Sequence, residues 1–314
     1  MTIPLIIDTD PGIDDAAAIS LALNHPQLDV KMITTVNGNV NIDKTTANAL
    51  KLKQFFNSSV PVFKGASRPL ISNPVDAAEV HGESGMDGYD FKSPTDETIS
   101  PMNAIEAMKN VLKESTSPIT IVAIGPLTNI ALLLATYPEI KSKIKQIVIM
   151  GGSSGRGNVT PLVEFNIYCD PEAANIVFNS QLPLVMVGLD LARQAMFSHE
   201  FIKKIKTMNQ TGDMLFQLFQ HYRTENVHEG IKLYDVFTIL YLIDADLFNV
   251  FDANVQIELQ GILTKGATVV DFDPIEPNCQ VVHSPISKHY QQAFLQALAP
   301  VSYTHLTLPT NREV

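Results

Sequence analysis

Leu5-Ile-Ile-Asp-Thr-Asp-Pro-Gly-Ile-Asp-Asp-Ala16 joins a run of apolar residues directly to a cluster of four acids. The apolar run belongs to residues 3–7, whose composition is typical of a strand covered on both faces in a parallel sheet. Pro11 and Gly12 favour a turn, and the amphipathic residues 14–23 that follow predict a helix. This part of the chain therefore predicts a buried strand that passes through a turn into a helix, the repeating unit of α/β sheets.

The same alternation continues along the chain. Further short apolar runs predict buried strands at residues 30–36, 119–124, 147–150 and 184–187. Amphipathic segments predict helices at residues 44–56, 103–112, 127–134, 171–178, 198–208, 213–222, 235–245 and 285–298, and a further strand group falls between 255 and 282. Strands that alternate with helices predict an α/β fold with a Rossmann-like, mostly parallel central sheet flanked by helices.

Composition and organisation limit the classes of protein. The 314 residues, 45% of them hydrophobic, can bury a large core, and we expect one domain over residues 1–300 with a disordered or non-native tail at 301–314. A net charge of -11 disfavours nucleic acid and anionic membranes as partners. Cys169 and Cys279 are too few for a disulfide framework, and no segment has the length of a membrane span. We therefore expect a cytoplasmic protein.

The four acids Asp8, Asp10, Asp14 and Asp15 follow the first predicted strand. In open α/β sheets, ligands bind beyond the carboxyl ends of the strands, which is where these acids lie. Like charges this close need compensation, and a hard divalent cation such as Ca2+, or alternatively Mg2+, supplies it. The alternative is that Asp14 and Asp15 only favour the start of a helix. Because all four acids crowd together after a buried strand, we favour a metal site.

A second alternative is a phosphatase of the haloacid dehalogenase type, which also begins with a hydrophobic strand and Asp-x-Asp. In that group the first Asp attacks phosphorus. Here Pro11 and Gly12 follow the second acid in place of the usual Gly-Thr, and the chain offers no convincing later Asp-Asp metal pair. We therefore rank this alternative low.

Polar motifs also follow the other predicted strands. They are Asn37-Gly-Asn39, Gly125-Pro-Leu-Thr-Asn129, Met150-Gly-Gly152 and residues 158–172. Since parallel strands end at one edge of a sheet, these motifs are predicted to converge on one crevice. Glu164 and Asn166 alternate with apolar residues, which predicts that they share one face of an extended segment. Asp170 and Pro171 have the pattern of an ordinary helix start.

In combination, these motifs resemble the inosine-uridine-preferring nucleoside hydrolase family, whose hallmark Asp-Thr-Asp-Pro-Gly-x-Asp-Asp matches residues 8–15. The motifs at 38–39, 81–88, 125–129, 150–152 and 164–166 follow in family order, and the resemblance spans residues 3 to about 298. It is nearest to bacterial ribonucleoside hydrolases of broad or pyrimidine-leaning specificity. The resemblance implies the nucleoside hydrolase fold, hydrolysis of the N-glycosidic bond of ribonucleosides in nucleoside salvage, and assembly as a homodimer or homotetramer.

The resemblance also implies roles for individual residues. Ca2+ would be bound by the carboxylates of Asp10, Asp15 and Asp235 and by the backbone carbonyl of Thr128, and Asp10 would also be the general base. The ribose hydroxyls would be held by Asp14, Asn39, Asn158, Glu164, Asn166 and the main chain near Met150, and His81 would lie near the base.

Tyr234 is where the sequence departs from the family. A His-Asp pair is common there, its His serving as the acid for the leaving base, whereas this chain has Tyr234 and Asp235. Tyrosine, with a reference pKa near 10, is a weaker acid than imidazolium. Either Tyr234 or one of the nearby groups assists the base, or activity on purines is low. The nearby groups are His81, Tyr222 and His228, although His228 and His221 lie in a polar stretch typical of a surface.

The absence of the His that serves as acid for the leaving base raises a further alternative. In it, the protein is a ribose- or nucleoside-binding homologue without catalysis, and Tyr234 is a packing residue. The acids that would activate water all remain in the chain, so we favour the enzyme.

Overall fold

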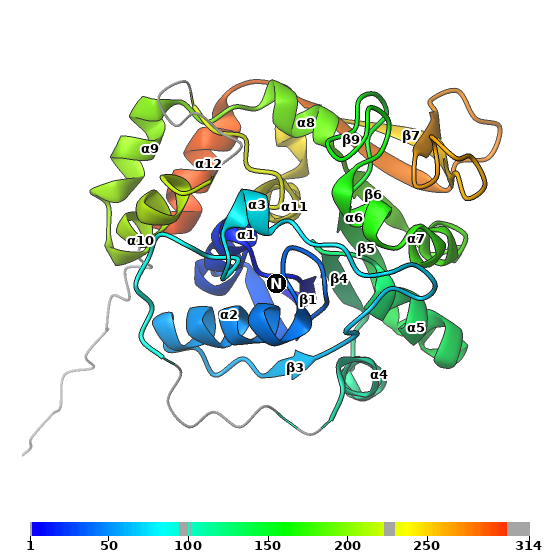
Figure 1. The fold of residues 1–314 in the computed structure, drawn as a ribbon, viewed down its shortest axis with the longest axis horizontal. Coiled ribbons are helices and arrows are strands. Elements are labelled where there is room, and N and C mark those ends of the chain that lie inside the picture. Colours follow the sequence, from blue (N-terminus) through cyan, green and yellow to red (C-terminus); the bar gives the residue numbers. More distant parts are fainter. Residues whose placement is uncertain (1, 94–99, 101, 223–229, 300–314) are drawn as a thin grey trace, which may run out of the picture.

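The computed structural model of the protein describes residues 2–93, 100, 102–222 and 230–299 (Figure 1). His228 and the predicted tail at 301–314 lie outside these residues. Nine strands form one sheet in the order β3-β2-β1-β4-β5-β6-β9-β7-β8. The strands are β1 (Ile3–Thr9), β2 (Leu28–Thr35), β3 (Val62–Lys64), β4 (Ile119–Ala123), β5 (Ile144–Met150), β6 (Leu184–Val187), β7 (Phe248–Ile257), β8 (Thr268–Asp271) and β9 (Cys279–Pro285).

The sheet confirms the predicted α/β class. Neighbouring strands from β3 to β9 pair in parallel, whereas β7 pairs antiparallel with both β9 and β8. The order of the first six strands is that of the Rossmann fold, in which the strand order reverses between β1 and β4. Ligands of such folds bind at this reversal, so the topology itself marks the edge on which to search for the site.

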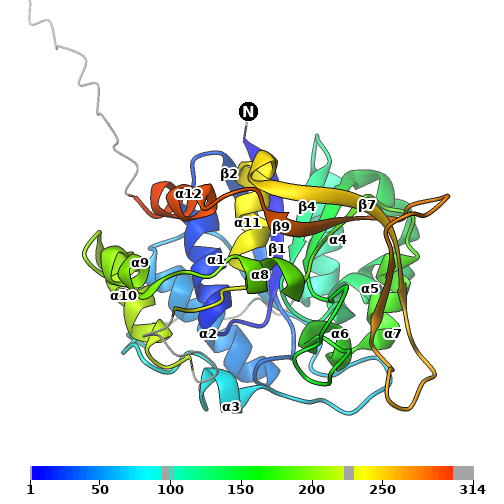
Figure 2. The same ribbon diagram turned by 90° about the horizontal axis from the view of Figure 1, so that it is seen from above.

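Helices cover both faces of the sheet (Figure 2). One side carries α1 (Ile13–Asn24), α2 (Ile42–Phe55), α9 (His199–Lys206), α10 (Gln210–Phe219), α11 (Val236–Ile243) and α12 (His289–Leu298). The other carries α4 (Ala104–Glu114), α5 (Thr128–Thr136) and α7 (Pro171–Phe178). Shorter helices are α3 (Ala78–His81), α6 (Phe165–Cys169) and α8 (Leu189–Gln194), with two 3-10 turns at Pro138–Lys143 and Ala245–Leu247.

The apolar runs of the strands are explained by these two covered faces. Leu5 and Ile7 of β1 belong to the core beneath α1, whereas Ile6 between them belongs to the core on the opposite side of the sheet. Because successive side chains of a strand alternate between faces, a strand buried on both sides has to be apolar at every position. The resulting rigid sheet fixes the carboxyl ends of the strands, where the polar motifs lie.

Two sequence-based predictions about local structure were wrong. The segment with Glu164 and Asn166 is not extended: α6 begins at Phe165, and the Glu164 carboxylate caps it by accepting from the backbone N–H groups of Asn166 and Ile167. A side chain that bonds the first free amides stabilises a helix start, which the apolar alternation concealed. The last helix begins at His289 rather than 285 because β9 continues to Pro285.

Two findings bear on the predicted setting of the protein. Both cysteines are free and buried, as expected for Cys169. Within the described ranges, no helix combines the length and the apolar character that crossing a membrane requires.

Candidate active site

A pocket of about 790 Å³ opens at the carboxyl ends of β1, β4 and β5. The predicted site residues that line it are Asp14, Asn39, His81, Met150, Asn158, Glu164, Asn166, Tyr234 and Asp235. The other three, Asp10, Asp15 and Thr128, are buried and do not belong to its wall. Residues from segments more than two hundred positions apart in the sequence, such as Asp14 and Asp235, therefore meet here.

The turn between β1 and α1 is built around Asp15. Its carboxylate accepts from the backbone N–H of Gly12 at 2.9 Å, the reciprocal bond of a capping box, and from the Thr9 hydroxyl at 2.6 Å. Asn39 donates to the same carboxylate at 3.1 Å from the end of β2. Asp15 thus stabilises the start of α1, as the alternative of a purely structural role predicted, but it also bonds Thr9 at the end of β1 and Asn39 beyond β2.

Asp10 lies beneath the pocket, between two glycines. Its Oδ2 accepts from the Asn39 backbone N–H at 2.6 Å, while its Oδ1 is buried without a hydrogen-bond partner among the described residues. A Cβ on Gly38 would lie 1.9 Å from Oδ2, and one on Gly125 would lie 2.6 Å from Oδ1. No other residue type fits at Gly38 without moving this carboxylate, so the Asn-Gly-Asn motif is needed for close approach.

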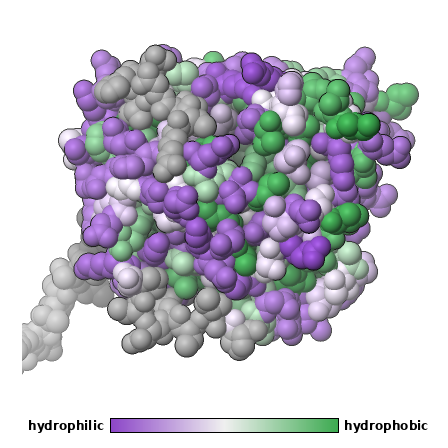
Figure 3. Space-filling view, viewed as in Figure 1, coloured by the Kyte–Doolittle hydropathy of each residue, from purple (hydrophilic) through white to green (hydrophobic). Residues whose placement is uncertain are grey.

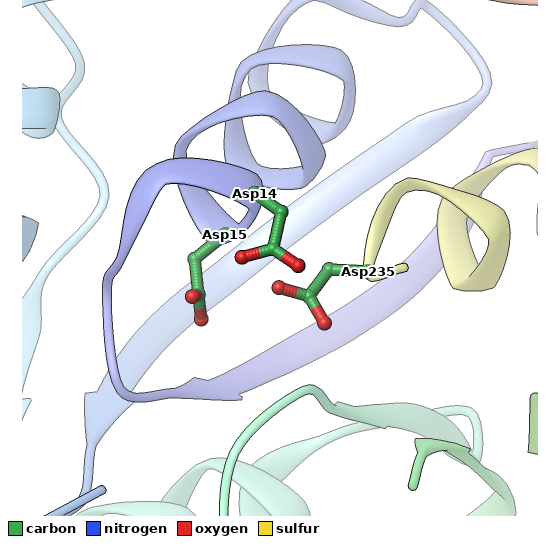
Figure 4. A group of neighbouring side chains, drawn as sticks. All are labelled: Asp14, Asp15 and Asp235. Atoms are coloured by element: carbon green, nitrogen blue, oxygen red, sulfur yellow. The ribbon is translucent and has the colours of Figure 1, made fainter. Parts of the chain in front are cut away.

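Asp14, Asp15 and Asp235 form the closest carboxylate group of the site (Figure 4). Each offers an oxygen that lies within 4.8 Å of the others, and the three side chains point toward one another from the start of α1 and the residue before α11. All three are almost completely buried.

The charges of this carboxylate group are costly without an ion. Burial, followed by the charges of neighbouring acids, raises the pKa of Asp15 to about 6 and that of Asp235 well above its ordinary range. Burial likewise raises the pKa of Asp14 to about 6, and burial with the charge of Asp15 raises that of Asp10. Buried carboxylate oxygens within 4.8 Å of one another are the kind of donors that a hard divalent cation binds. Asp10 lies outside this group of three, and within the described part of the chain its Oδ1 has no hydrogen-bond partner. The site could therefore hold a metal ion.

His81 and Tyr222 are two aromatic neighbours of Asp14. The Tyr222 hydroxyl donates to Asp14 Oδ2 at 3.2 Å, and the His81 ring lies 5.3 Å from the Tyr222 ring. His81 Nδ1 accepts from the Ile13 backbone N–H at 3.1 Å, which assigns the ring proton to Nε2. Burial lowers the pKa of His81 to about 4. His81 is therefore a neutral hydrogen-bond donor in the pocket rather than a cationic acid.

Glu164 and Asn166 sit where β5 leads into α6. Glu164 Oε2 accepts from the Gly152 backbone N–H at 3.0 Å, and burial raises the pKa of this carboxyl to about 7. The Asn166 side chain donates to the backbone carbonyls of Met150 at 3.0 Å and of Ile124 at 3.3 Å. These bonds join the ends of β4 and β5 to α6 and fix both polar side chains in the pocket wall.

Thr128, predicted as a metal ligand through its carbonyl, is held by its own side chain. Its hydroxyl donates to Asp170 Oδ2 at 2.7 Å, while Asp170 Oδ1 caps α7 by accepting from the Ala173 N–H at 3.1 Å. The next residue, Asn129, donates to Asp8 Oδ1 at 2.7 Å. The helix start predicted at Asp170 is confirmed, and its link to Thr128 is a contact that the local sequence pattern does not indicate.

Asn158 and Tyr234 complete the comparison with the predicted site. Asn158 lies on an exposed loop and its Oδ1 accepts from the Phe165 N–H at 2.9 Å. Tyr234 is half-buried in the pocket wall, and its backbone hydrogen bond to Asp14 favours the charged form of that acid. His221 is exposed, as its polar surroundings predicted.

Comparisons with known proteins give the family of the chain. The model of the inosine-uridine preferring nucleoside hydrolase family matches residues 5–293. A non-specific ribonucleoside hydrolase of Salmonella newport is 52% identical over 269 residues, covering 86% of this chain and 88% of that protein. One of Klebsiella pneumoniae is 50% identical over 273 residues, covering 87% and 90%. The structure of a purine-preferring ribonucleoside hydrolase from Gardnerella vaginalis matches with a TM-score of 0.87 at 29% identity, covering 94% of this chain and 98% of that chain.

The extent of these matches settles the relationship. The family match runs from β1 into α12 and so includes every segment that contributes to the pocket. Identity of half or more extends over most of both chains in the bacterial relatives. The chain therefore belongs to the inosine-uridine preferring nucleoside hydrolase family, and it is an N-glycosyl hydrolase.

Proposed function

We propose that the protein hydrolyses the N-glycosidic bond of ribonucleosides to ribose and free base, with Ca2+ as its metal and Asp10 as general base. The observation that carries this proposal is the group of facing carboxylates formed by Asp14, Asp15 and Asp235. The charges of Asp14 and Asp15 act on Asp10, whose Oδ1 is buried with no hydrogen-bond partner among the described residues. Family membership leaves the phosphatase alternative without support. Incubation with uridine, cytidine, inosine and adenosine, followed by a reducing-sugar assay, tests the proposal, which predicts ribose release that a chelator abolishes.

The reaction needs a deprotonated water and a stabilised sugar cation, because such hydrolysis passes through an oxocarbenium-like transition state. Ca2+, when bound, supplies positive charge that lowers the pKa of a nearby water. Asp15, Asp235 and the carbonyl of Thr128 would hold the ion with Asp10. Asp10 Oδ1, which no protein donor occupies among the described residues, is then the atom that accepts the proton of the attacking water.

The polar wall of the pocket suits the ribose. Asp14, Asn39, Asn158, Glu164 and Asn166 would bind its hydroxyls, with the main chain near Met150. The carboxylates of Asp14 and Glu164, bound to the ribose hydroxyls, would also stabilise the positive charge that develops on the sugar. Since Glu164 and Asn166 are fixed by backbone bonds to α6 and β5, they need little reorganisation when the substrate binds.

Loss of the metal is predicted to make stability depend on pH. The pKa values of Asp14 and Asp15 are raised in the folded protein to about 6, above those of the unfolded chain. Without metal, protonation of these two acids therefore stabilises the folded state over the unfolded state below pH 4. This stabilisation is lost as the pH rises through about 6. Thermal unfolding from pH 4 to 8 should show that Tm without calcium falls mainly between pH 4 and 6. With calcium, Tm should remain nearly level, which leaves a gap of roughly 5 °C at pH 8. Parallel curves with and without calcium would contradict the proposed site.

Tyr234 is the proposed partner of the leaving base. Its hydroxyl can donate a hydrogen bond to a pyrimidine but protonates a purine poorly, because tyrosine, with a reference pKa near 10, is a weak acid. Tyr234→Phe is expected to lower kcat for uridine several-fold, whereas Tyr234→His should raise kcat for inosine relative to uridine. Steady-state kinetics with both substrates measure this. If Tyr234→Phe leaves kcat and KM unchanged for both uridine and inosine, Tyr234 is a packing residue.

Family membership also counts against the alternative from the sequence, a nucleoside-binding homologue without catalysis. Such a homologue would bind uridine in calorimetry and release no ribose at any calcium concentration. The intact set of buried acids favours the enzyme, since a binder needs no proton acceptor beneath the sugar.

We also propose a homodimer or homotetramer, supported by exposed apolar side chains near β7 and β8, such as Ile262 and Ile275 (Figure 3). Light scattering of the purified protein would give the oligomeric state.

A further inference from the structure

One wall of the pocket is a loop between β5 and α6 that contains little regular structure. This β5–α6 loop, residues 153–163, contributes Arg156, Gly157, Asn158 and Val159 to the pocket lining. Within it, the Val163 carbonyl accepts from the backbone N–H of Asn158 at 3.1 Å and of Val159 at 3.2 Å. These and other internal bonds curl the loop, and Thr268 fixes its first residue, Ser153, through two hydrogen bonds.

The short helix α8 holds the loop through two side chains, and one of them, Arg193, also lines the pocket. At its start, Asp190 Oδ2 accepts from the Ser154 backbone N–H at 2.6 Å and from the Ser154 hydroxyl at 3.0 Å. At its end, the Arg193 guanidinium donates to two consecutive backbone carbonyls, that of Gly157 at 2.9 Å and that of Arg156. The two side chains lie one helical turn apart and hold two points of the same loop.

We propose that Arg193 is a positioning residue of the ribose site, which acts by holding the carbonyls of Arg156 and Gly157 so that Asn158 faces the substrate. This inference rests on the proposed function, in which Asn158 binds a ribose hydroxyl. The planar guanidinium presents two parallel donors, so it fixes both the place and the direction of a peptide segment. A lysine at the same position can hold only one point.

The path from Arg193 to the substrate is short and continuous. Gly157, whose carbonyl Arg193 binds, is joined by one peptide bond to Asn158. The Asn158 side chain accepts from the N–H of Phe165, the first residue of α6, and α6 is capped by Glu164. Release of the loop would therefore loosen Asn158 first, because the Glu164 carboxylate has its own bonds to the N–H groups of Gly152, Asn166 and Ile167.

The first test separates substrate binding from chemistry. Arg193→Ala is expected to raise KM for uridine, and the Kd of uridine by calorimetry, roughly tenfold while kcat falls less than KM rises, because lost preorganisation weakens binding of the sugar. Arg193→Lys should recover part of the affinity. Gln194→Ala is the matched control: Gln194 belongs to the same helix but donates to the carbonyls of Asp190 and His283 rather than to the loop, so it should leave KM unchanged.

The second test asks whether Arg193 acts through Asn158. In an Asn158→Ala background, removal of Arg193 should raise Kd little further, because its effect has already been lost. Full additivity of the two changes, or an unchanged Kd in the single Arg193→Ala variant, would overturn the inference. An absence of ribose release by the unaltered enzyme would instead count against the proposed function, and the Kd measurements would still decide the role of Arg193.

Discussion

Asp10→Asn is expected to reduce kcat for uridine by roughly 10³-fold, since general base catalysis contributes about 10²- to 10⁴-fold and no other described side chain takes the same place. The amide keeps the size of the carboxylate and can still accept from the Asn39 backbone N–H, so the turn is retained. It cannot accept the proton of the attacking water. Steady-state kinetics with saturating calcium measure the change.

Asp8→Asn is the matched control for this variant. Asp8 lies two residues earlier, in β1, and its Oδ1 accepts from the Thr34 hydroxyl and the Asn129 side chain, contacts that an amide oxygen can keep. The control should retain kcat within roughly tenfold, below the usual contribution of a general base. Asp10 would lose its proposed role if the two variants had similar activity.

Removal of the 2′-hydroxyl from the substrate is expected to have an effect of similar size. A site built to hydrogen-bond a hydroxyl rejects an analogue without it by about 10⁴-fold, because its buried polar groups are left unpaired. Asp14, Asn39, Glu164 and Asn166 are such groups: all are buried at the pocket. The ratio of kcat/KM for 5-methyluridine and thymidine measures this directly, because the two nucleosides differ only at the 2′ position.

The control for this comparison changes the base and keeps the sugar. Uridine and 5-methyluridine share the ribose and differ by one methyl group, which is worth about 1–3 kcal/mol at most in a pocket. Their kcat/KM values should therefore lie much closer than those of 5-methyluridine and thymidine. Equal efficiency on 5-methyluridine and thymidine would show that the polar wall does not read the ribose.

Local sequence patterns were sufficient for the parts of the fold that depend on neighbouring residues. The strand at 184–187 and the helix at 171–178 match β6 and α7, because an apolar run and a Pro at the first helical position act locally. The acids after β1 were also found from sequence, since the end of a buried strand fixes where they lie. The close approach of Gly38 to Asp10 is the structural reason for the motif that follows β2.

Contacts between distant residues could not be read in the same way. The start of α6 at Phe165 depends on Glu164 bonding its own amides, and the apolar alternation around it favoured an extended chain. Arg193 carries no motif: its contact with Gly157 exists only because β5 and β6 are neighbours in the sheet. The link between Thr128 and Asp170 arises in the same way, from packing of α5 against α7.

The central claim is that buried oxygens from separate segments form one calcium site. Its most direct test is calorimetric titration of calcium into chelator-treated protein, alongside Asp235→Ala as the variant that removes one facing carboxylate. The account predicts one ion bound per chain, recovery of uridine hydrolysis in proportion to occupancy, and at least a tenfold loss of calcium affinity in the variant. Full hydrolysis by protein that binds no calcium would contradict it.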